Sequence, residues 1–80
     1  MPMSKYMRLI VMFDLPTATV GERRAANQFR HFLLHDGYYM MQFSIYVRLC
    51  NGQEAATKHR GRLLRELPEE GSVRTLLVTE

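Results

Sequence analysis

The longest run of hydrophobic residues lies near the start of the chain and leads directly into an acid. Residues 9–13 are all apolar, Asp14 follows them, and Pro16 comes two positions later. A run of this length, rich in β-favouring side chains, predicts a buried strand over residues 8–14. Because Pro16 cannot extend a strand ladder, we expect the chain to leave the sheet just past Asp14.

A helix is predicted after this strand. Thr19 followed by Glu22 matches a capping box, and Gly37 can supply the left-handed residue that ends a helix reaching about Asp36. At about 100° per residue, one side of this helix is apolar and the opposite side is polar and almost purely cationic. The apolar side holds Ala25, Ala26, Phe29, Phe32 and Leu33, and the polar side holds Arg23, Arg24, Asn27, Arg30 and His31.

The rest of the chain repeats the alternation of strands and a helix. Strand-like hydrophobic segments flank a break at residues 42–44, and the turn signal Asn51-Gly52 precedes a second helical pattern. That helix has an apolar stripe of Ala56, Leu63 and Leu67 and an opposite cationic stripe of Lys58, Arg62 and Arg65. The predicted elements are strands over 38–41 and 44–49, a helix over 53–67 and a last strand over 73–78.

The resulting order, β-α-β-β-α-β, is the ferredoxin-like arrangement of an α+β protein, and residues 1–80 read as one domain. Both helices should cover one face of a four-stranded antiparallel sheet. On the first strand Leu9 and Phe13 point to one face, whereas Met12 and Asp14 point to the other, so the uncovered face is also apolar. Such a face normally meets a partner. We therefore expect a two-fold homodimer through the sheet faces, with both Asp14 side chains near a common axis.

Composition narrows the class of protein only moderately. With 46% apolar and 24% charged residues the chain is an ordinary globular protein, and its formal charge of +3 permits nucleic-acid binding without demanding it. A single cysteine, Cys50, excludes an intrachain disulfide and a Cys-rich metal site. It is expected in the core or a loop, which fits a cytoplasmic protein. No apolar run is long enough for a membrane span, and no membrane partner is expected.

Three sets of residues can carry chemistry, and each has a plainer alternative. Asp14 is a candidate ligand for Mg²⁺, which needs only one or two protein carboxylates, or it caps the next loop or pairs with an arginine. Ser44 at the strand break can reach a phosphate or simply satisfy the backbone of a turn. The cations of the first helix suit a line of phosphates or form a solvated face; they are Arg23, Arg24, Arg30 and His31.

These stretches resemble a known family. The strand Leu9-Ile10-Val11-Met12-Phe13-Asp14-Leu15-Pro16-Thr17, the helix segment Phe29-Arg30-His31-Phe32-Leu33 and the segment Tyr38-Tyr39-Met40-Met41-Gln42-Phe43-Ser44-Ile45-Tyr46 look like CRISPR-associated protein two, in the version found in type II systems. The later segment Gly71-Ser72-Val73-Arg74 to Leu76-Leu77-Val78-Thr79-Glu80 also fits, so the likeness covers nearly the whole chain.

The resemblance implies a ferredoxin-like homodimer at the centre of the spacer-acquisition complex. In that family two dimers of the CRISPR integrase flank one such dimer, and the assembly holds double-stranded DNA. It also implies magnesium-dependent endonuclease activity on RNA or DNA, with magnesium at Asp14 and with Ser44, or Phe43 beside it, near the active site. By the same likeness Arg23, Arg24 and Arg30 are nucleic-acid contacts.

Two features depart from the family pattern. Leu15 stands where many nuclease-active relatives have tyrosine. Family members also usually continue beyond the fourth strand into a strand that crosses to the partner, and this chain stops at Glu80, so we expect that strand to be missing. The alternatives from other functional classes are a toxin-type metal-dependent ribonuclease of the same fold and a non-catalytic DNA-binding scaffold.

Overall fold

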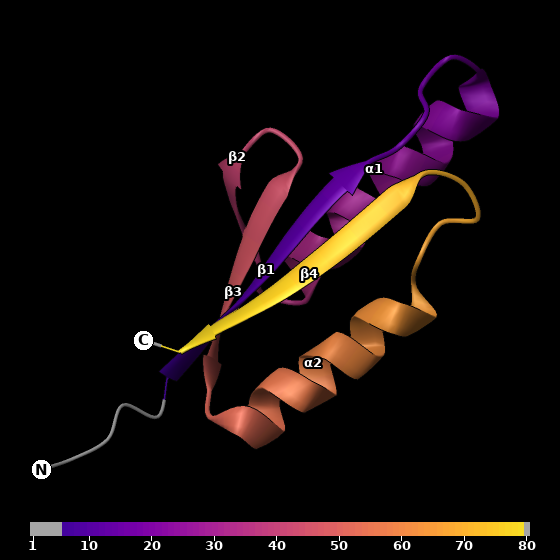
Figure 1. Cartoon of the computed structure of the whole chain (residues 1–80). Coiled ribbons are helices and arrows are strands. Elements are labelled where there is room, and N and C mark those ends of the chain that lie inside the picture. The colour runs from indigo at the N-terminus through magenta and orange to yellow at the C-terminus, as the bar shows by residue number, and fades with distance from the viewer. Residues whose placement is uncertain (1–5, 80) are drawn as a thin grey trace, which may run out of the picture.

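The strand that ends at Asp14 lies inside a four-stranded sheet with the order β2-β3-β1-β4, in which neighbouring strands are antiparallel. The computed structural model describes residues 6–79. Its elements are β1 (Tyr6–Asp14), α1 (Val20–His35), β2 (Tyr39–Gln42), β3 (Ile45–Asn51), α2 (Gln53–Arg65) and β4 (Ser72–Thr79), shown in Figure 1. This confirms the predicted ferredoxin-like β-α-β-β-α-β order.

One face of the sheet packs against both helices. From β1, Leu9, Val11 and Phe13 are buried on this face. The Phe13 ring meets Phe29 of α1 edge-on, with 5.2 Å between centroids, and stacks on Tyr46 of β3 at 5.6 Å. The same buried cluster includes side chains from both helices, so a single core joins them to the sheet; its members are Leu9, Val11, Phe13, Phe29, Leu33, Tyr38, Tyr46, Cys50, Ala56 and Leu63.

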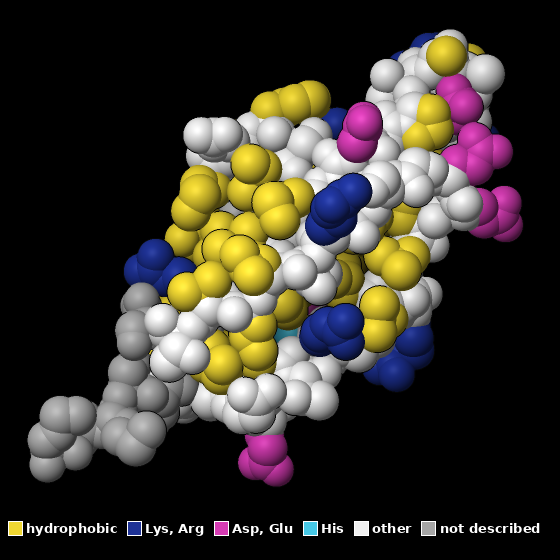
Figure 2. Space-filling model, in the orientation of Figure 1, with side chains coloured by type: hydrophobic (Ala, Val, Ile, Leu, Met, Phe, Trp, Pro, Cys, Tyr) yellow, Lys and Arg dark blue, Asp and Glu magenta, His cyan; other side chains and the backbone are white. Residues whose placement is uncertain are grey.

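The other face of the sheet is apolar and uncovered, as the alternation along β1 predicted. Ile10 lies between Val47 of β3 and Leu76 of β4 on this open face. Leu49 and Leu76 remain 45% and 53% exposed. Figure 2 shows hydrophobic side chains gathered over the strands, with basic side chains among and beside them. In the strand register Arg74 of β4 is paired with Met12, so this cation also belongs to the open face.

Local signals set the ends of α1 as predicted. The Thr19 hydroxyl accepts a hydrogen bond from the Glu22 backbone N–H at 3.1 Å, and the Glu22 carboxylate accepts one from the Thr19 N–H at 2.9 Å, which completes the capping box. At the other end, Gly37 adopts a φ of +94°. This left-handed conformation ends the helix at little cost because glycine has no Cβ.

Several boundaries differ from the predictions by one or two residues. α2 ends at Arg65 rather than at Leu67, and Leu67 is 42% exposed instead of belonging to the buried stripe. A residue before proline is disfavoured in the α conformation, so Pro68 ends the helix early. β2 begins at Tyr39 rather than Tyr38 and carries a bulge between Met40 and Gln42. Within residues 6–79, neither helix has the length and apolar composition needed to cross a bilayer.

Candidate functional site

Asp14 is the last residue of β1 and lies on the open face, opposite Ser72 of β4. Its side chain is exposed, and within residues 6–79 it makes no hydrogen bond or ion pair. The plainer alternatives, a loop cap or an arginine pair, are therefore not seen. The carboxylate is available to an external cation.

The turn between α2 and β4 packs closely against this strand end. Gly71 adopts a φ of +98°, and a Cβ built on it would lie 2.6 Å from the backbone oxygen of Asp14 and 2.8 Å from Cδ2 of Leu15. No side chain fits in that space, so glycine is required for the turn to reach the end of β1. Gly71 thus helps to fix the backbone that carries the carboxylate.

Ser44 lies beside the same strand end. Its carbonyl oxygen accepts a hydrogen bond from the Phe13 N–H at 3.1 Å, which places it one residue from Asp14 in the ladder. Ser44 is also the one non-glycine residue with positive φ in the described chain, at +67°. Such residues often occupy functional positions. Asp14 and Ser44, 30 positions apart in the sequence, are thus brought to one end of the sheet.

Phe43 and Arg30 form a cation–π pair at this end of the sheet. Phe43 is 77% exposed, and the guanidinium carbon of Arg30 lies 5.1 Å from its ring centroid. Arg30 Nη1 also donates to Asn27 Oδ1 at 3.1 Å, while its Nε is buried without a partner in the described structure. Arg30 is therefore only partly exposed, although its hydrogen-bond partner Asn27 belongs to the polar side predicted for both residues. Ala26 and Leu33, four residues before it and three after, are both buried, so Arg30 lies at the boundary of the packed side.

The other three helix cations separate into two kinds. Arg23 Nη1 donates to the carbonyl oxygens of Thr17 and Ala18, each at 3.2 Å, and so braces the loop before the helix. Arg24 and His31 are exposed and make no hydrogen bond or ion pair with any described residue. They are seven positions apart and lie on one stripe of α1, about 10 Å apart along its axis. Of the four cations, Arg24 and His31 are the two that are exposed and without a partner among the described residues.

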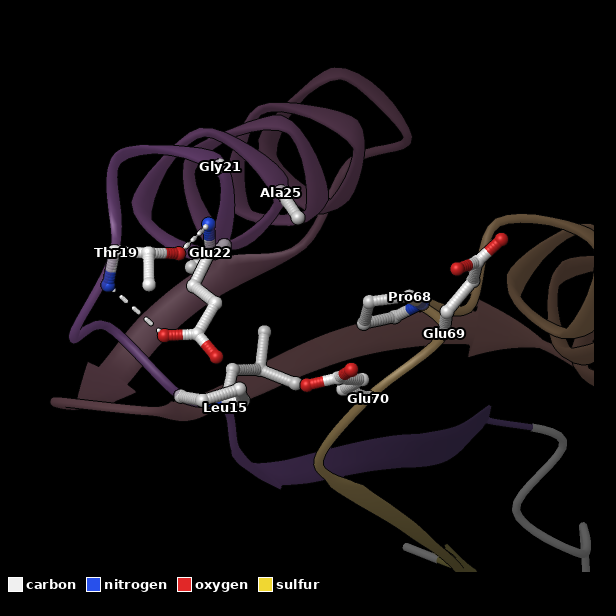
Figure 3. A pocket seen from close by; sticks show the side chains of 10 residues that line it. Leu15, Thr19, Gly21, Glu22, Ala25, Pro68, Glu69 and Glu70 are labelled. Atoms are coloured by element: carbon white, nitrogen blue, oxygen red, sulfur yellow. Dashed lines mark hydrogen bonds between the residues drawn. The ribbon is translucent and has the colours of Figure 1, made fainter.

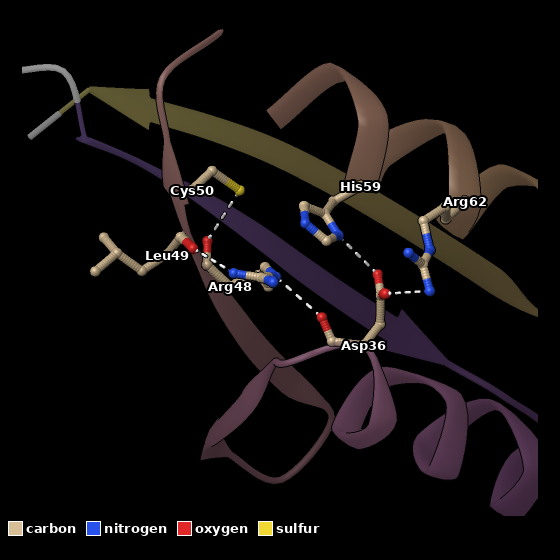
Figure 4. A network of polar contacts seen from close by, with 6 residues as sticks. All are labelled: Asp36, Arg48, Leu49, Cys50, His59 and Arg62. Carbon is tan, nitrogen blue, oxygen red and sulfur yellow. Dashed lines mark hydrogen bonds and ion pairs between the residues drawn. The ribbon is translucent and has the colours of Figure 1, made fainter. Parts of the chain in front are cut away.

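A buried ion-pair network joins the two helices and β3, and the sequence reading missed it (Figure 4). Asp36, 6% exposed, forms an ion pair with Arg62, with 2.8 Å between Oδ1 and Nη2, and its Oδ2 lies 3.0 Å from His59 Nδ1. Its backbone oxygen accepts a hydrogen bond from Arg48 Nε at 2.9 Å. Two signals could have indicated the network. A carboxylate at a helix C-terminus opposes the helix dipole and needs a partner, and His59 shares the spacing of Ala56 and Leu63 on the buried side of α2.

Two further polar groups in this region are held in their neutral forms. Burial raises the pKa of the Tyr38 hydroxyl above its usual range, and the nearby Asp36 charge adds to the effect. Burial likewise raises the pKa of the Cys50 thiol, although Arg48 acts in the opposite direction. A buried, protonated thiol is a poor nucleophile. Cys50 therefore belongs to the core, as predicted, and not to a reactive site.

The donors available to a metal are few. Among residues 6–79 no group of three or more His, Cys, Asp or Glu side chains is arranged to hold a metal ion. Asp14 offers one exposed carboxylate, a hard oxygen ligand of the type that Mg²⁺ prefers. Within residues 6–79, Asp14 therefore offers a single carboxylate and not a complete set of metal ligands.

Comparison with known proteins shows which family the sequence of this chain matches. Residues 7–80 match the family model described as CRISPR associated protein Cas2. The chain is 60% identical over 74 residues to a protein of Acidovorax ebreus named CRISPR-associated endoribonuclease Cas2. That alignment covers 92% of this chain and 72% of the relative. Proteins of the same name from Campylobacter jejuni and Flavobacterium psychrophilum are 42% and 46% identical over 95% and 90% of the chain. The alignments span 53% and 63% of those two relatives, which are therefore considerably longer than the matched region.

Proposed function

Because the chain belongs to the CRISPR associated protein Cas2 family, we propose that it is a subunit of the CRISPR adaptation machinery, working as a homodimer with the CRISPR integrase. In this proposal the dimer binds double-stranded nucleic acid through α1 and carries a magnesium-dependent endonuclease site at Asp14. The observation that supports it best is the position of Asp14 at the end of the open apolar face, where a second copy can reach it.

The open face supports the dimer. Ile10, Val47 and Leu76 lie in one apolar row across three strands. Val47 is already buried in the single chain, whereas Leu76 and the nearby Leu49 leave about half of their surface in water. Covering such a face removes apolar area from water at about 25 cal/mol per Å². A two-fold contact uses the same patch on both copies, so the two Asp14 carboxylates approach the axis together.

Asp14 fits magnesium in this arrangement. Mg²⁺ usually retains several waters and takes one or two carboxylates, so a pair of Asp14 side chains is a sufficient protein contribution. When bound, the ion supplies Lewis-acid polarisation of a phosphodiester. The chain's own residues then position the substrate: Arg30, held against Phe43, presents a cation near the strand end, and Ser44 presents its backbone and hydroxyl beside it.

The arrangement predicts how activity depends on both copies. Wild-type chains and Asp14→Asn chains are unfolded together, refolded at varied ratios and assayed on RNA and on DNA with and without Mg²⁺. If each ion needs both carboxylates, cleavage falls as the square of the wild-type fraction. A linear fall means that each chain works alone, and equal cleavage by pure wild type and pure variant refutes the assignment of Asp14. Glu54→Gln, an exposed acid in the first turn of α2, is the matched control and should cleave normally.

The nucleic-acid surface is tested separately through salt dependence. Each phosphate contact contributes about 0.9 to the slope of log K against log salt on duplex DNA. Arg24→Ala should therefore lower the slope by about 1, because Arg24 is free, whereas Arg23→Ala should lower it less, because Arg23 is already bonded to its own loop. An unchanged salt slope of DNA binding in Arg24→Ala would refute the assignment of this face of α1 to the nucleic-acid interface. Binding without any cleavage would identify the chain as a scaffold.

A further inference from the structure

A groove runs between the start of α1 and the segment that joins α2 to β4. Its first section has a volume of about 410 Å³, and a second section of about 320 Å³ continues from it past Phe29 and Leu67. The two sections share Ala25, Pro68 and Glu69. The groove is therefore elongated, and its shape suits a segment of polypeptide better than a compact small molecule.

The floor and the rim of the groove differ in character. Leu15, Pro16, Ala25, Ala26 and Pro68 make an apolar floor in the first section. The rim carries four glutamates, Glu22, Glu66, Glu69 and Glu70, against one arginine, Arg65. Figure 3 shows the Glu22 and Glu70 carboxylates on either side of the Leu15 side chain.

This local charge is opposite to that of the whole chain. The chain has eight acids and a formal charge of +3, yet half of its acids lie on this rim. Figure 2 also shows acidic side chains gathered at the end of the molecule where α1 begins. Carboxylates repel phosphates, so the groove is not a continuation of the nucleic-acid surface. An occupant that complements it carries positive charge beside an apolar side chain.

Several local contacts restrain the walls of the groove. Pro16 and Pro68 have fixed φ angles, and the capping box fixes Thr19 and Glu22. The close contact of Gly71 with Leu15 fixes the turn that carries Glu70. A preformed groove binds a segment without an ordering cost of its own. Glu22 Oε1 accepts the backbone bonds from Ala18 and Thr19, while its second oxygen faces no described donor.

We propose that this groove is a docking site for a protein partner, which inserts an extended segment with an apolar side chain flanked by lysine or arginine. The apolar side chain rests on the floor, and the cations pair with the rim glutamates. This surface is distinct from the sheet face and from the Arg24–His31 stripe of α1. It extends the proposed function by adding a protein contact that requires neither metal at Asp14 nor bound nucleic acid.

Titration of the isotope-labelled full chain with synthetic peptides tests the proposal by NMR. Three peptides of equal length alternate leucine with arginine, leucine with glutamate, or serine with arginine. The leucine–arginine peptide should shift the amide signals of Leu15, Ala25, Ala26 and Glu70 and should bind more weakly as salt rises. The other two should leave these signals unchanged. Shifts centred on Leu49 and Leu76, or equal binding of the leucine–glutamate peptide, would overturn the proposal.

Variants separate the charge of the rim from the shape of the floor. Glu69→Gln combined with Glu70→Gln removes two exposed pairs and should weaken the leucine–arginine peptide about 2-fold to 30-fold. Ala25→Leu fills the junction of the two sections and should abolish binding, with circular dichroism verifying the fold. Glu54→Gln, which lies outside the groove, should bind like wild type. Unchanged affinity in the double glutamate variant would refute the charge argument.

The same variants distinguish this docking site from the nucleic-acid surface. The double glutamate variant should retain duplex DNA binding, and Arg24→Ala should retain peptide binding. A lower salt slope of DNA binding in Arg24→Ala, together with normal peptide binding, supports both the α1 surface and the groove. If peptide binding is lost in Arg24→Ala, the peptide lies on the Arg24–His31 stripe of α1 and the groove proposal fails. That result leaves the proposed function untouched.

Discussion

Replacing Asp36 by alanine is the most direct test of the network that joins the two helices. The Asp36 side chain is 3% exposed, and its partners His59 and Arg62 are 11% and 47% exposed. Breaking a fully buried pair costs about 3–5 kcal/mol. Here Arg62 can return to water, so losing its ion pair with Asp36 costs only about 0.2–1 kcal/mol of stability. Losing the hydrogen bond between His59 and the charged carboxylate costs about 1.5–3 kcal/mol. We expect Asp36→Ala to lower the free energy of unfolding by about 2–4 kcal/mol.

Asp36→Asn isolates the role of charge, because asparagine has nearly the same shape. Its amide oxygen can still accept from Arg62, and its amide N–H can donate to His59 if the ring takes the other tautomer. Asp36→Asn therefore loses only the extra strength that the negative charge gives to these two contacts. We therefore expect a smaller loss, about 1 kcal/mol, in this variant.

Urea unfolding followed by circular dichroism, at one fixed protein concentration, measures these changes. Double-mutant cycles with His59→Ala and Arg62→Ala then measure the interaction energy of Asp36 with each of its two partners. The coupling of Asp36 with His59 should exceed its coupling with Arg62, since His59 is far less exposed. Glu54→Gln should unfold within about 0.5 kcal/mol of wild type. A loss below about 1 kcal/mol in Asp36→Ala, or a stronger coupling to Arg62, would refute the reasoning from burial.

Three other variants or measurements test single features. Tyr38→Phe should leave the free energy of unfolding unchanged or raise it by up to about 1 kcal/mol in urea titrations, because the hydroxyl is buried without a partner in the described structure. Gly71→Ala should cost about 1–3 kcal/mol in the same assay, since the new Cβ would lie 2.6 Å from the Asp14 backbone oxygen at a φ of +98°; wild-type stability would contradict the close approach. Cys50 should react with a thiol reagent at pH 8 only as fast as the chain opens, because the thiol is buried and its pKa is raised. Since the unfolded chain loses this proton first, stability should also fall as the pH rises above the usual thiol value, and Cys50→Ala should show a smaller fall.

Local signals in the sequence predicted most of the fold. The apolar run before Asp14, the Thr19–Glu22 capping box and Gly37 each act within a few residues, and each formed the predicted structure. The alternation along β1 also predicted two apolar sheet faces. Errors occurred where a distant or neighbouring residue changed a local preference, as when Pro68 ended α2 before Leu67.

The candidate site was only partly predictable. Asp14 and Ser44 could be chosen from the sequence, but their proximity depends on the pairing of β1 with β3, which is a contact between distant segments. The periodicity of α1 placed Arg30 on the polar side of the helix, but its contact with Phe43 depends on where the β2–β3 turn lies. Helical spacing gives a side chain its direction but does not say which neighbour occupies that space.

The sequence by itself determined the order of the elements, the apolar character of both sheet faces and the position of Asp14 at a strand end, because each follows from short-range periodicity and turn chemistry. Tertiary structure alone decided the Asp36 network, the contact of Arg30 with Phe43, and the acidic groove beside Leu15. Each of these depends on side chains that lie far apart along the chain and meet only when the helices pack on the sheet. Long-range proximity and burial, which set the strength of charge interactions, do not exist before that packing.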